Sequence, residues 1–411
     1  MSDPNSCETV IRLRRKRRKS YENRTVYEAA LERIEYLYKR FDKLVVGFSG
    51  GKDSTALLNL TVEVAGTLGK LPVEAVFFDE EAITPPTIEY VRRVMLRNDV
   101  RLSWYCLPFK HRNACSNEHP YWYCWNPSER GKWVREIPDW AITSHPRFEF
   151  GMSYQEFNDV MHPKGYNVCN LTGVRAQESL RRLRAVTSKR NDNYISISQL
   201  VPHIFKAHPI YDWGATDVWK YVAESGIDYN TTYDIVNKTQ FYNRLLAQRV
   251  CQPFGEEPLR SLWLYAECFP EMWHKILNRV DGVGTAWRYA NTDLYGVGNN
   301  EKPDNLTWRE YLDMIYDTYP SEFQPTVREN VERLVARHAD KTDDPVPAED
   351  SHPLTGLSWK LLCKIAAKGD FKGRTSQRIE NEAIKVQQKL GIGSYANALA
   401  IYGKKNIRVV E

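Results

Sequence analysis

Short apolar runs alternate with longer stretches of helical apolar spacing from about residue 25 to residue 240. The first two runs are 44–48 and 73–78, and the gap of about 25 residues between them suits a right-handed crossover between parallel neighbours. Further runs predict strands at 101–107, 167–173 and 194–200. Helical spacing predicts helices at 25–40, through Leu57, Leu60 and Val64, and at 87–97, 176–190 and 215–224. This alternation predicts an α/β fold with an open, mostly parallel sheet and flanking helices.

The alternation is interrupted once and later ends. Residues 108–164 are rich in tryptophan and proline, which is typical of an insertion, and beyond about Asp234 the pattern becomes mainly helical. The segment 341–352, KTDDPVPAEDSH, has the composition of a linker. The predicted organisation is a basic arm at 1–24, an α/β domain at 25–240, a helical region at 241–340, a linker at 341–352 and a small basic helical tail at 353–411.

The composition is that of an ordinary globular protein, with 42% hydrophobic and 27% charged residues in a chain of 411. No stretch approaches the roughly 18 apolar residues of a membrane span. The segment Met1–Glu8 is polar where a signal peptide needs an apolar core. The sequence therefore predicts a cytoplasmic protein of about two or three domains that does not enter a membrane.

Positive charge is concentrated near the start of the chain. Residues 12–19 contribute seven positive charges in eight residues, and without them the net charge falls from +5 to −2. Such a run is expected either to contact the phosphates of a nucleic acid or to form a solvated tail. Both interpretations stay open at the level of the sequence.

The eight cysteines include no Cys-x-x-Cys pair and are expected to be reduced thiols that mostly pack in the core. Five potential metal ligands fall within nineteen residues of the insertion: Cys106, His111, Cys115, His119 and Cys124. Structural zinc sites usually pair their ligands about two to four residues apart, and this spacing is absent, so zinc is not favoured here. The nearby tryptophans could stack on bases, although core packing is their commoner role.

A small polar loop, SGGKDS at 49–54, joins the first predicted strand to the following helix. Several backbone N–H groups of such a turn point to one place, with the positive end of the helix dipole behind them, so the loop predicts an anion site. The Walker spacing fails, because counting back from Gly51 reaches Val46 and an aspartate follows the lysine. The dinucleotide fingerprint fails because Ser49 stands two residues after Gly47. The loop therefore predicts phosphate binding without kinase-like or hydride transfer.

The hexamer resembles the PP-loop, S-G-G-x-D-S, of the ATP pyrophosphatase family, whose enzymes bind the β,γ-phosphates of ATP and cleave between α and β. The resemblance implies the adenine nucleotide alpha-hydrolase (HUP-like) fold, with ATP and Mg²⁺ as cofactors. It also implies that Lys52 neutralises charge on the leaving group and that Asp53 holds Mg²⁺, which makes both catalytic. The ATP-binding residues implied in this segment are Ser49, Gly50, Gly51, Lys52, Asp53, Ser54 and Thr55.

Two further segments resemble phosphoadenosine-phosphosulfate (PAPS) reductases and the small subunits of sulfate adenylyltransferases. The segment 77–91 has Asp79 at the end of the second strand, where the resemblance implies a place near adenosine. The segment 171–186 matches the block G-x-R-x-x-E-S-x-x-R and brings Gly173 and Arg175 to the ligand edge of the sheet. The competing interpretations are a solvated acidic helix entry and a solvated arginine-rich helix.

The same block implies a clamp for phosphate or sulfate, because a guanidinium fork fits such oxyanions. Its members are Glu178, which is expected to orient the arginines, Arg181 and Arg182. A last segment, 208–230, resembles the P-x-x-D-W-x-x-x-D-V-W-x-Y-I block of the same domain. Together the matched segments cover about 41–240, roughly half of the chain.

The chain departs from the PAPS reductases in two ways. It lacks the E-C-G-L-H-type motif of their nucleophilic cysteine, and Cys363 lies in an apolar helix pattern that indicates packing. Its S-G-G-x-D-S loop sequence is complete, whereas the reductases typically have an altered version of this sequence. The insertion and the segment 279–320 resemble the long PAPS-reductase-like proteins known as immunoglobulin-binding regulators, a group whose name supplies no substrate.

The sequence therefore predicts an ATP-dependent transferase that adenylates an acceptor, releases pyrophosphate and belongs to sulfur metabolism. The expected acceptor is nucleic acid or a sulfur-oxyanion metabolite, and a protein partner is a further expectation. Two alternatives stay open. One is PAPS or adenylyl-sulfate reductase-like activity, and the other is a nucleotide-gated regulator that binds a nucleotide without cleaving it.

Overall fold

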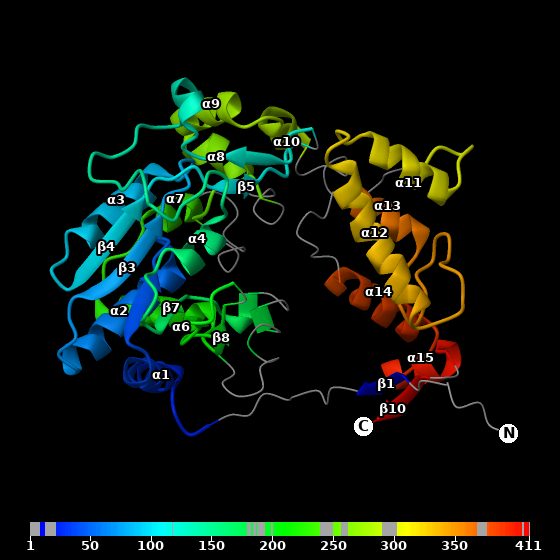
Figure 1. Ribbon diagram of the computed structural model, residues 1–411, viewed down its shortest axis with the longest axis horizontal. Helices are drawn as coiled ribbons and strands as arrows, with labels where there is room; N and C mark the ends of the chain where they lie inside the picture. Colours follow the sequence, from blue (N-terminus) through cyan, green and yellow to red (C-terminus); the bar gives the residue numbers. More distant parts are fainter. Residues whose placement is uncertain are drawn as a thin grey trace. The chain divides into compact units, whose positions relative to one another are not determined.

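The computed structural model describes residues 9–12, 22–116, 118–178, 182–183, 186, 194–198, 200–238, 250–255, 262–289, 302–367, 376–404 and 407–410. The chain divides into two compact units (Figure 1). One unit is Glu22–Asn291, and the other combines Met1–Tyr21 with Thr292–Glu411. Each unit is described by itself below.

A six-stranded sheet forms the centre of the unit 22–291, with the strand order β4-β3-β2-β7-β9-β8. The strands are β2 (Lys43–Gly47), β3 (Val73–Phe78), β4 (Val100–Tyr105), β7 (Val168–Leu171), β8 (Ile195–Ile197) and β9 (Ile204–Ala207). All neighbours are parallel except β8, which runs antiparallel to β9. The predicted open, mostly parallel sheet is confirmed.

Helices cover this sheet at the predicted places: α1 (Val26–Arg40), α2 (Lys52–Thr67), α3 (Pro85–Met95) and α6 (Ala215–Ser225). Helix α1 begins with a capping box of Thr25 and Glu28. Helices α1 and α6 both pack on α2, which lies against β2 and β3. The buried apolar residues of α2 therefore hold its first turn at the end of β2. Of the helix predicted at 176–190, the structure describes a short turn of 3-10 helix, η2 (Ala176–Glu178), and isolated residues beyond it.

The strand β9 is a difference from the sequence analysis, which assigned no element to 204–207. It lies between β7 and β8 and pairs with both. The strand has only four residues and lies between Pro202 and Pro209. So short a run does not show the alternation of apolar and polar residues that identifies a strand. Its place in the sheet matters because its carboxyl end lies beside that of β7, which leads to Gly173.

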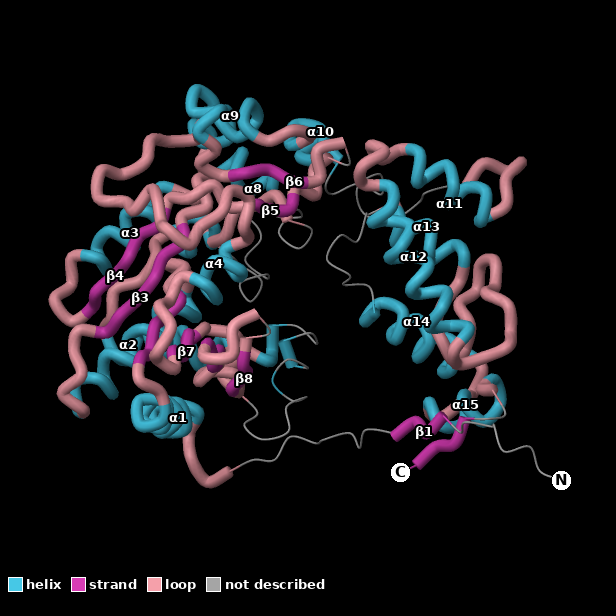
Figure 2. Tube along the Cα trace, viewed as in Figure 1, coloured by secondary structure: helices cyan, strands magenta, loops and turns pink. Residues whose placement is uncertain are grey.

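The insertion at 108–164 packs on the edge of the sheet formed by β3 and β4. It contains an antiparallel hairpin of β5 (Lys110–Arg112) and β6 (Tyr121–Tyr123), the 3-10 helix η1 (Pro127–Lys132) and α4 (Tyr154–Val160) (Figure 2). Phe157 of α4 packs on Phe78 and Tyr105 with ring centroids 5.9 and 5.5 Å away. The insertion is therefore fixed to β3 and β4 by aromatic contacts.

The helices described after the sheet in the same unit are α7 (Thr232–Asn237), α8 (Leu262–Cys268), α9 (Pro270–Arg279) and α10 (Val283–Tyr289). The boundary between the two compact units therefore falls near residue 291, within the helical region predicted at 241–340. The physical reason is a set of buried contacts between α9 and the insertion, described below.

The second unit contains α11 (Trp308–Asp317), α12 (Gln324–Ala339), α13 (Trp359–Ala366), α14 (Ser376–Lys389) and α15 (Tyr395–Tyr402). Apolar side chains of α11, α12 and α13 share one core. The expected linker at 341–352 thus lies inside a unit, where Trp308 donates to Glu349 over 3.2 Å and the Lys360 amide donates to the Ala348 carbonyl over 3.0 Å. Most of the segment is exposed or half-buried, and Thr342 and His352 are its buried residues.

Strand β1 (Thr9–Arg12) pairs in parallel with β10 (Ile407–Val410) in this second unit. Of the basic run 12–19, Arg12 alone lies among the described residues, so nucleic-acid binding by this run stays a prediction. Within the described part of the chain, no helix is long and apolar enough to span a membrane.

Candidate functional site

The loop 49–54 connects β2 to α2 and is held in shape by its own hydroxyl groups. The Ser54 hydroxyl accepts from the Ser49 amide over 3.2 Å and donates to the Gly51 carbonyl over 2.9 Å. Gly50 has a φ of +70°, which favours glycine, and a Cβ there would lie 2.9 Å from Val91 Cγ2 of α3. Gly51 is the N-cap of α2, and no side chain caps it. The loop is therefore tightly folded at the positive end of a 16-residue helix.

Three charged side chains meet at the first turn of α2. Lys52 Nζ lies 3.1 Å from Asp53 Oδ2, and Arg175 Nε donates to Asp53 Oδ1 over 2.7 Å. Lys52 is 3% exposed and Arg175 is 1% exposed. Burial lowers the pKa of Lys52, and attraction to Asp53 opposes this shift. Two buried cations thus contact the Asp53 carboxylate.

Glu178 lies between two arginines beside this cluster. Its carboxylate is 3.8 Å from Arg175 Nη2 and forms an ion pair with Arg182. Three cations and two carboxylates therefore gather around the loop among the described residues. Arg181, the third predicted member of the clamp, lies outside the described residues. The local excess of positive charge suits a phosphate-bearing ligand.

Gly173 brings the end of β7 into contact with the loop. A Cβ at this position would lie 2.9 Å from the Asp53 carbonyl carbon and 3.0 Å from the Ser54 amide nitrogen. These atoms belong to the backbone and have little freedom to move. Glycine is therefore required for the close approach between the loop and the strand that delivers Arg175.

Replacing Gly173 with alanine should lower the free energy of unfolding by about 1–3 kcal/mol, because the methyl group overpacks the loop backbone. Thermal unfolding measures this effect. Gly131→Ala is the matched control, since a Cβ at Gly131 meets nothing within 4 Å. Equal behaviour of the two variants would refute the close approach.

Two predicted ATP-binding residues are engaged elsewhere. Asp79 is completely buried, and its carboxylate accepts from Trp104 Nε1 over 2.8 Å and forms an ion pair with Arg135 of the insertion. The Thr55 hydroxyl lies 2.9 Å from the Tyr90 hydroxyl in the core. Both side chains form buried contacts within the protein in this structure. To contact ATP directly, as predicted, they would have to break these contacts.

Helix α9 is joined to the segment after β3 by a buried ion pair that the sequence analysis missed. Arg279 donates to both carboxylate oxygens of Glu81, over 2.7 and 3.0 Å, and the two side chains are 1% and 0% exposed. Glu81 also accepts from the backbone amides of Trp125 and Val134 over 2.7 and 3.0 Å. Its φ of +63° is rare outside glycine. The glutamate after β3 thus joins the sheet, the insertion and α9.

The segment after α6 covers the loop and was also missed. Asn230 Nδ2 donates to the Gly50 carbonyl over 2.9 Å and to Thr87 Oγ1 over 2.8 Å. The Lys52 amide donates to the Tyr233 hydroxyl over 2.9 Å. Asn230 is the last residue of the segment 208–230 that resembles the family block, and this resemblance could have indicated its role. Tyr233 lies just beyond that segment. A separation of 181 residues hides the second contact from sequence patterns.

Of the five potential metal ligands, His111 and Cys124 contact each other, and Cys106 and His119 each contact an aspartate. His111 Nε2 lies 3.5 Å from Cys124 Sγ, Cys106 lies 3.5 Å from Asp79, and His119 faces Asp281 at the surface. Burial raises the pKa of the Cys106 thiol far above its ordinary value. No group of three or more histidine, cysteine, aspartate or glutamate side chains that could hold a metal occurs within the described ranges.

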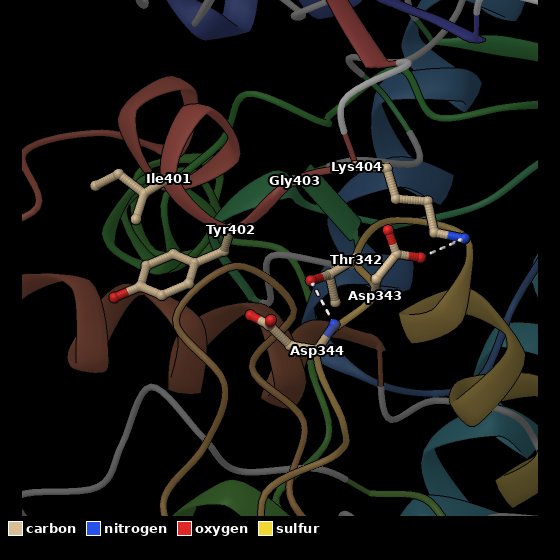
Figure 3. A pocket seen from close by; sticks show the side chains of 7 residues that line it. All are labelled: Thr342, Asp343, Asp344, Ile401, Tyr402, Gly403 and Lys404. Atoms are coloured by element: carbon tan, nitrogen blue, oxygen red, sulfur yellow. Dashed lines mark hydrogen bonds and ion pairs between the residues drawn. The ribbon is translucent and has the colours of Figure 1, made fainter.

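One hollow lies in the second unit, with a volume of about 550 Å³ (Figure 3). Its lining residues are Thr342, Asp343, Asp344, Ile401, Tyr402, Gly403 and Lys404. Lys404 forms an ion pair with Asp343 at 3.3 Å, and no predicted site residue lines the hollow. Cys363 of the same unit is buried, and its thiol donates to the Trp308 carbonyl over 3.0 Å, with burial raising its pKa to about 12. A buried thiol of this kind packs and does not attack a substrate.

Comparison with known proteins identifies the family. The phosphoadenosine phosphosulfate reductase domain matches residues 43–239, and a domain of unknown function, DUF3440, matches residues 244–341. Uncharacterized protein YbdN of Escherichia coli (strain K12) is 31% identical over 366 residues, which is 84% of this chain and 88% of YbdN. The chain belongs to the PAPS reductase-like family. Uncharacterized protein MJ0973 of Methanocaldococcus jannaschii is 26% identical over 56% of this chain and 47% of that protein.

Solved structures similar to this PAPS reductase-like chain include two fungal enzymes. FMN adenylyltransferase from Candida glabrata aligns over 52% of this chain and 62% of the enzyme, with 13% identity and a TM-score of 0.33. PAPS reductase from Candida auris aligns over 53% of this chain and 93% of the enzyme, with 16% identity and a TM-score of 0.29. The chain thus spans less than two thirds of the adenylyltransferase, and its fold class depends on the strand order and register given above.

Proposed function

We propose that this chain binds ATP at the loop 49–54 and cleaves it between the α and β phosphates, transferring AMP to an acceptor. The observation that carries the proposal is the buried cluster of Lys52, Asp53 and Arg175 beside an intact loop. The three cations and two carboxylates of the described cluster leave an excess of positive charge that favours an anion, and the positive end of α2 favours the same ligand. A triphosphate chain meets both requirements.

The proposed reaction is a displacement at the α-phosphorus. An oxygen of the acceptor attacks this phosphorus, the bond to the α,β-bridging oxygen breaks, and pyrophosphate leaves with the electron pair. Lys52 would stabilise the negative charge that grows on the pyrophosphate, together with the loop amides. Arg175 holds the Asp53 carboxylate and can bind a phosphate oxygen with its other nitrogens. Alignment and charge stabilisation would then provide most of the rate enhancement.

Magnesium fits this arrangement through Asp53. Mg²⁺ is commonly held by one or two carboxylates together with phosphate oxygens of the substrate. The Asp53 side chain is 17% exposed, and its two oxygens contact Lys52 and Arg175. This carboxylate would therefore bind the cation when the phosphates arrive with it. Bound there, Mg²⁺ would neutralise charge on the phosphates.

The acceptor is proposed to be nucleic acid or a sulfur-oxyanion metabolite. Arg182 and Glu178 form a charged pair next to Arg175, which would suit a phosphate or sulfate group of either acceptor. The basic run 12–19 would favour nucleic acid, because such runs bind phosphate backbones. A protein partner of the helical unit is a further part of this proposal.

A PAPS or adenylyl-sulfate reductase-like activity is the second candidate, favoured by one observation. Cys251 is exposed. The preceding Val250 lies next to the loop 49–54, because a Cβ built on Gly51 would be 3.3 Å from Val250 Cγ2. A cysteine at this place could reach a sulfonucleotide. Cys251→Ser separates the two candidates, because it should remove sulfite release in a reductase and leave pyrophosphate release unchanged in an adenylylating enzyme.

The test is a binding and product assay on the purified full chain with Mg·ATP and candidate acceptors. Accumulation of AMP and pyrophosphate supports the proposal, and Asp53→Ala should abolish it. Bound nucleotide without AMP over time would favour a nucleotide-gated regulator. Absence of both binding and turnover, with Asp53→Ala indistinguishable from the wild type, would rule the proposal out.

A further inference from the structure

The Tyr233 hydroxyl lies at the start of α2, next to the loop. The Lys52 amide, the first of the helix, donates to it over 2.9 Å. A Cβ built on Gly51 would lie 3.4 Å from the same oxygen. Tyr233 is 3% exposed, and Lys52 Nζ lies 5.8 Å from the centre of its ring. The hydroxyl of a tyrosine from α7 therefore lies beside Gly51 and Lys52 of the loop.

Neighbouring contacts fix the position of this tyrosine. The preceding Thr232 has its hydroxyl 2.8 Å from that of Thr84 and 3.1 Å from that of Thr87, both at the start of α3. The Tyr233 ring packs edge-on against Trp219, with ring centroids 5.2 Å apart at 88°. The hydroxyl is therefore held in place before any ligand binds, which reduces the entropy cost of using it.

The hydroxyl proton has no acceptor among the described residues. A phenol can accept and also donate one hydrogen bond, and here its oxygen accepts from Lys52. Burial raises the pKa of Tyr233, so the hydroxyl keeps its proton at neutral pH. A buried donor without an acceptor costs free energy that a bound anion would recover. The helix amide that donates to the oxygen also polarises the O–H group and makes it a better donor.

We propose that the Tyr233 hydroxyl donates a hydrogen bond to a phosphate oxygen of the diphosphate group that sits on the loop. This inference rests on the proposed function and adds a binding residue from outside the hexamer 49–54. The ligand class is a diphosphate or longer phosphate chain, because the donor adjoins Lys52, and Lys52 and Arg175 meet at Asp53 in the same turn. Helix α7 is then part of the binding site.

The test compares Tyr233→Phe with the wild type in calorimetric titrations with inorganic pyrophosphate and with adenosine, both in the presence of Mg²⁺. The variant keeps the ring and loses the donor, so pyrophosphate should bind about 10-fold more weakly or worse, while adenosine binding stays unchanged. Tyr229→Phe is the matched control, because that hydroxyl donates to Asp234 in the same segment. Tyr229→Phe should bind pyrophosphate as the wild type does.

Equal or tighter pyrophosphate binding by Tyr233→Phe would overturn the inference, as would an equal loss for pyrophosphate and adenosine. Wild-type protein that binds neither pyrophosphate nor ATP would instead remove the proposed function on which the inference rests. If Tyr233→Phe does not fold, 3-fluorotyrosine encoded at position 233 keeps the hydroxyl and supplies a fluorine signal. That signal should shift with pyrophosphate and not with adenosine, and an unmoved signal would overturn the inference.

Discussion

Replacing Lys52 with methionine should lower the rate of pyrophosphate release by about 100- to 1000-fold, the usual effect of removing one preorganised group that stabilises transition-state charge. Methionine keeps much of the volume of the buried stem and removes the ammonium group. The Asp53 carboxylate keeps its contact with Arg175, so the loop should stay folded. The rate should therefore fall much more than the affinity for ATP, because negative charge on the pyrophosphate is greatest in the transition state.

Lys70→Met is the matched control for this measurement. Lys70 follows α2 at its other end, where its ammonium group donates to the Tyr38 carbonyl over 3.1 Å at the surface. The control should release pyrophosphate at the wild-type rate. A Lys52→Met enzyme that stays within twofold of the wild type would show that the ammonium group does not act on the leaving group.

Replacing Arg279 with alanine should lower the free energy of unfolding of the unit 22–291 by about 3–5 kcal/mol, because it leaves a buried carboxylate without its counter-charge. The loss reaches beyond α9, since Glu81 also holds the backbone of the insertion at Trp125 and Val134. Arg279→Lys should recover little, because an ammonium group cannot bridge both carboxylate oxygens and the Tyr123 carbonyl.

Hydrogen exchange resolved by peptide on the full chain measures this effect and locates it. Exchange in Arg279→Ala should accelerate in peptides from 121–135 and 270–279 and stay unchanged in peptides from 308–366. Arg130→Ala is the control, because the Arg130 ion pair with Glu136 is exposed and worth about 1 kcal/mol at most. Arg279→Ala with the exchange rates of that control would contradict a structural role for the buried pair.

The helices and strands whose apolar residues recur at regular spacing were predictable from the sequence. The runs 44–48 and 73–78 became adjacent parallel strands, and the loop between the first of them and α2 is held together by contacts within six residues. Local hydrogen bonds and apolar spacing determine such features, so a single sequence contains their signal. The same holds for Arg175, whose place follows from the carboxyl end of a predicted strand.

Features made by distant residues were not predictable. The Glu81–Arg279 pair joins residues 198 apart, and its glutamate resembles any other member of an acidic run. The Tyr233 contact with Lys52 depends in the same way on how α7 returns to the loop. The linker expected at 341–352 has the composition of an exposed segment, yet neighbouring helices share a core around it. The composition of a segment indicates whether its side chains favour water. The positions of these residues depend instead on tertiary contacts, which composition does not reveal.

The most direct test of the central claim is chromatographic analysis of the adenine products formed from Mg·ATP by the wild-type chain, with a small-molecule extract and with nucleic acid as acceptor sources. The account predicts AMP together with pyrophosphate, and about 100- to 1000-fold slower AMP formation by Lys52→Met. Formation of ADP and phosphate, or ATP that is neither cleaved nor retained by the protein with any acceptor source, would contradict it.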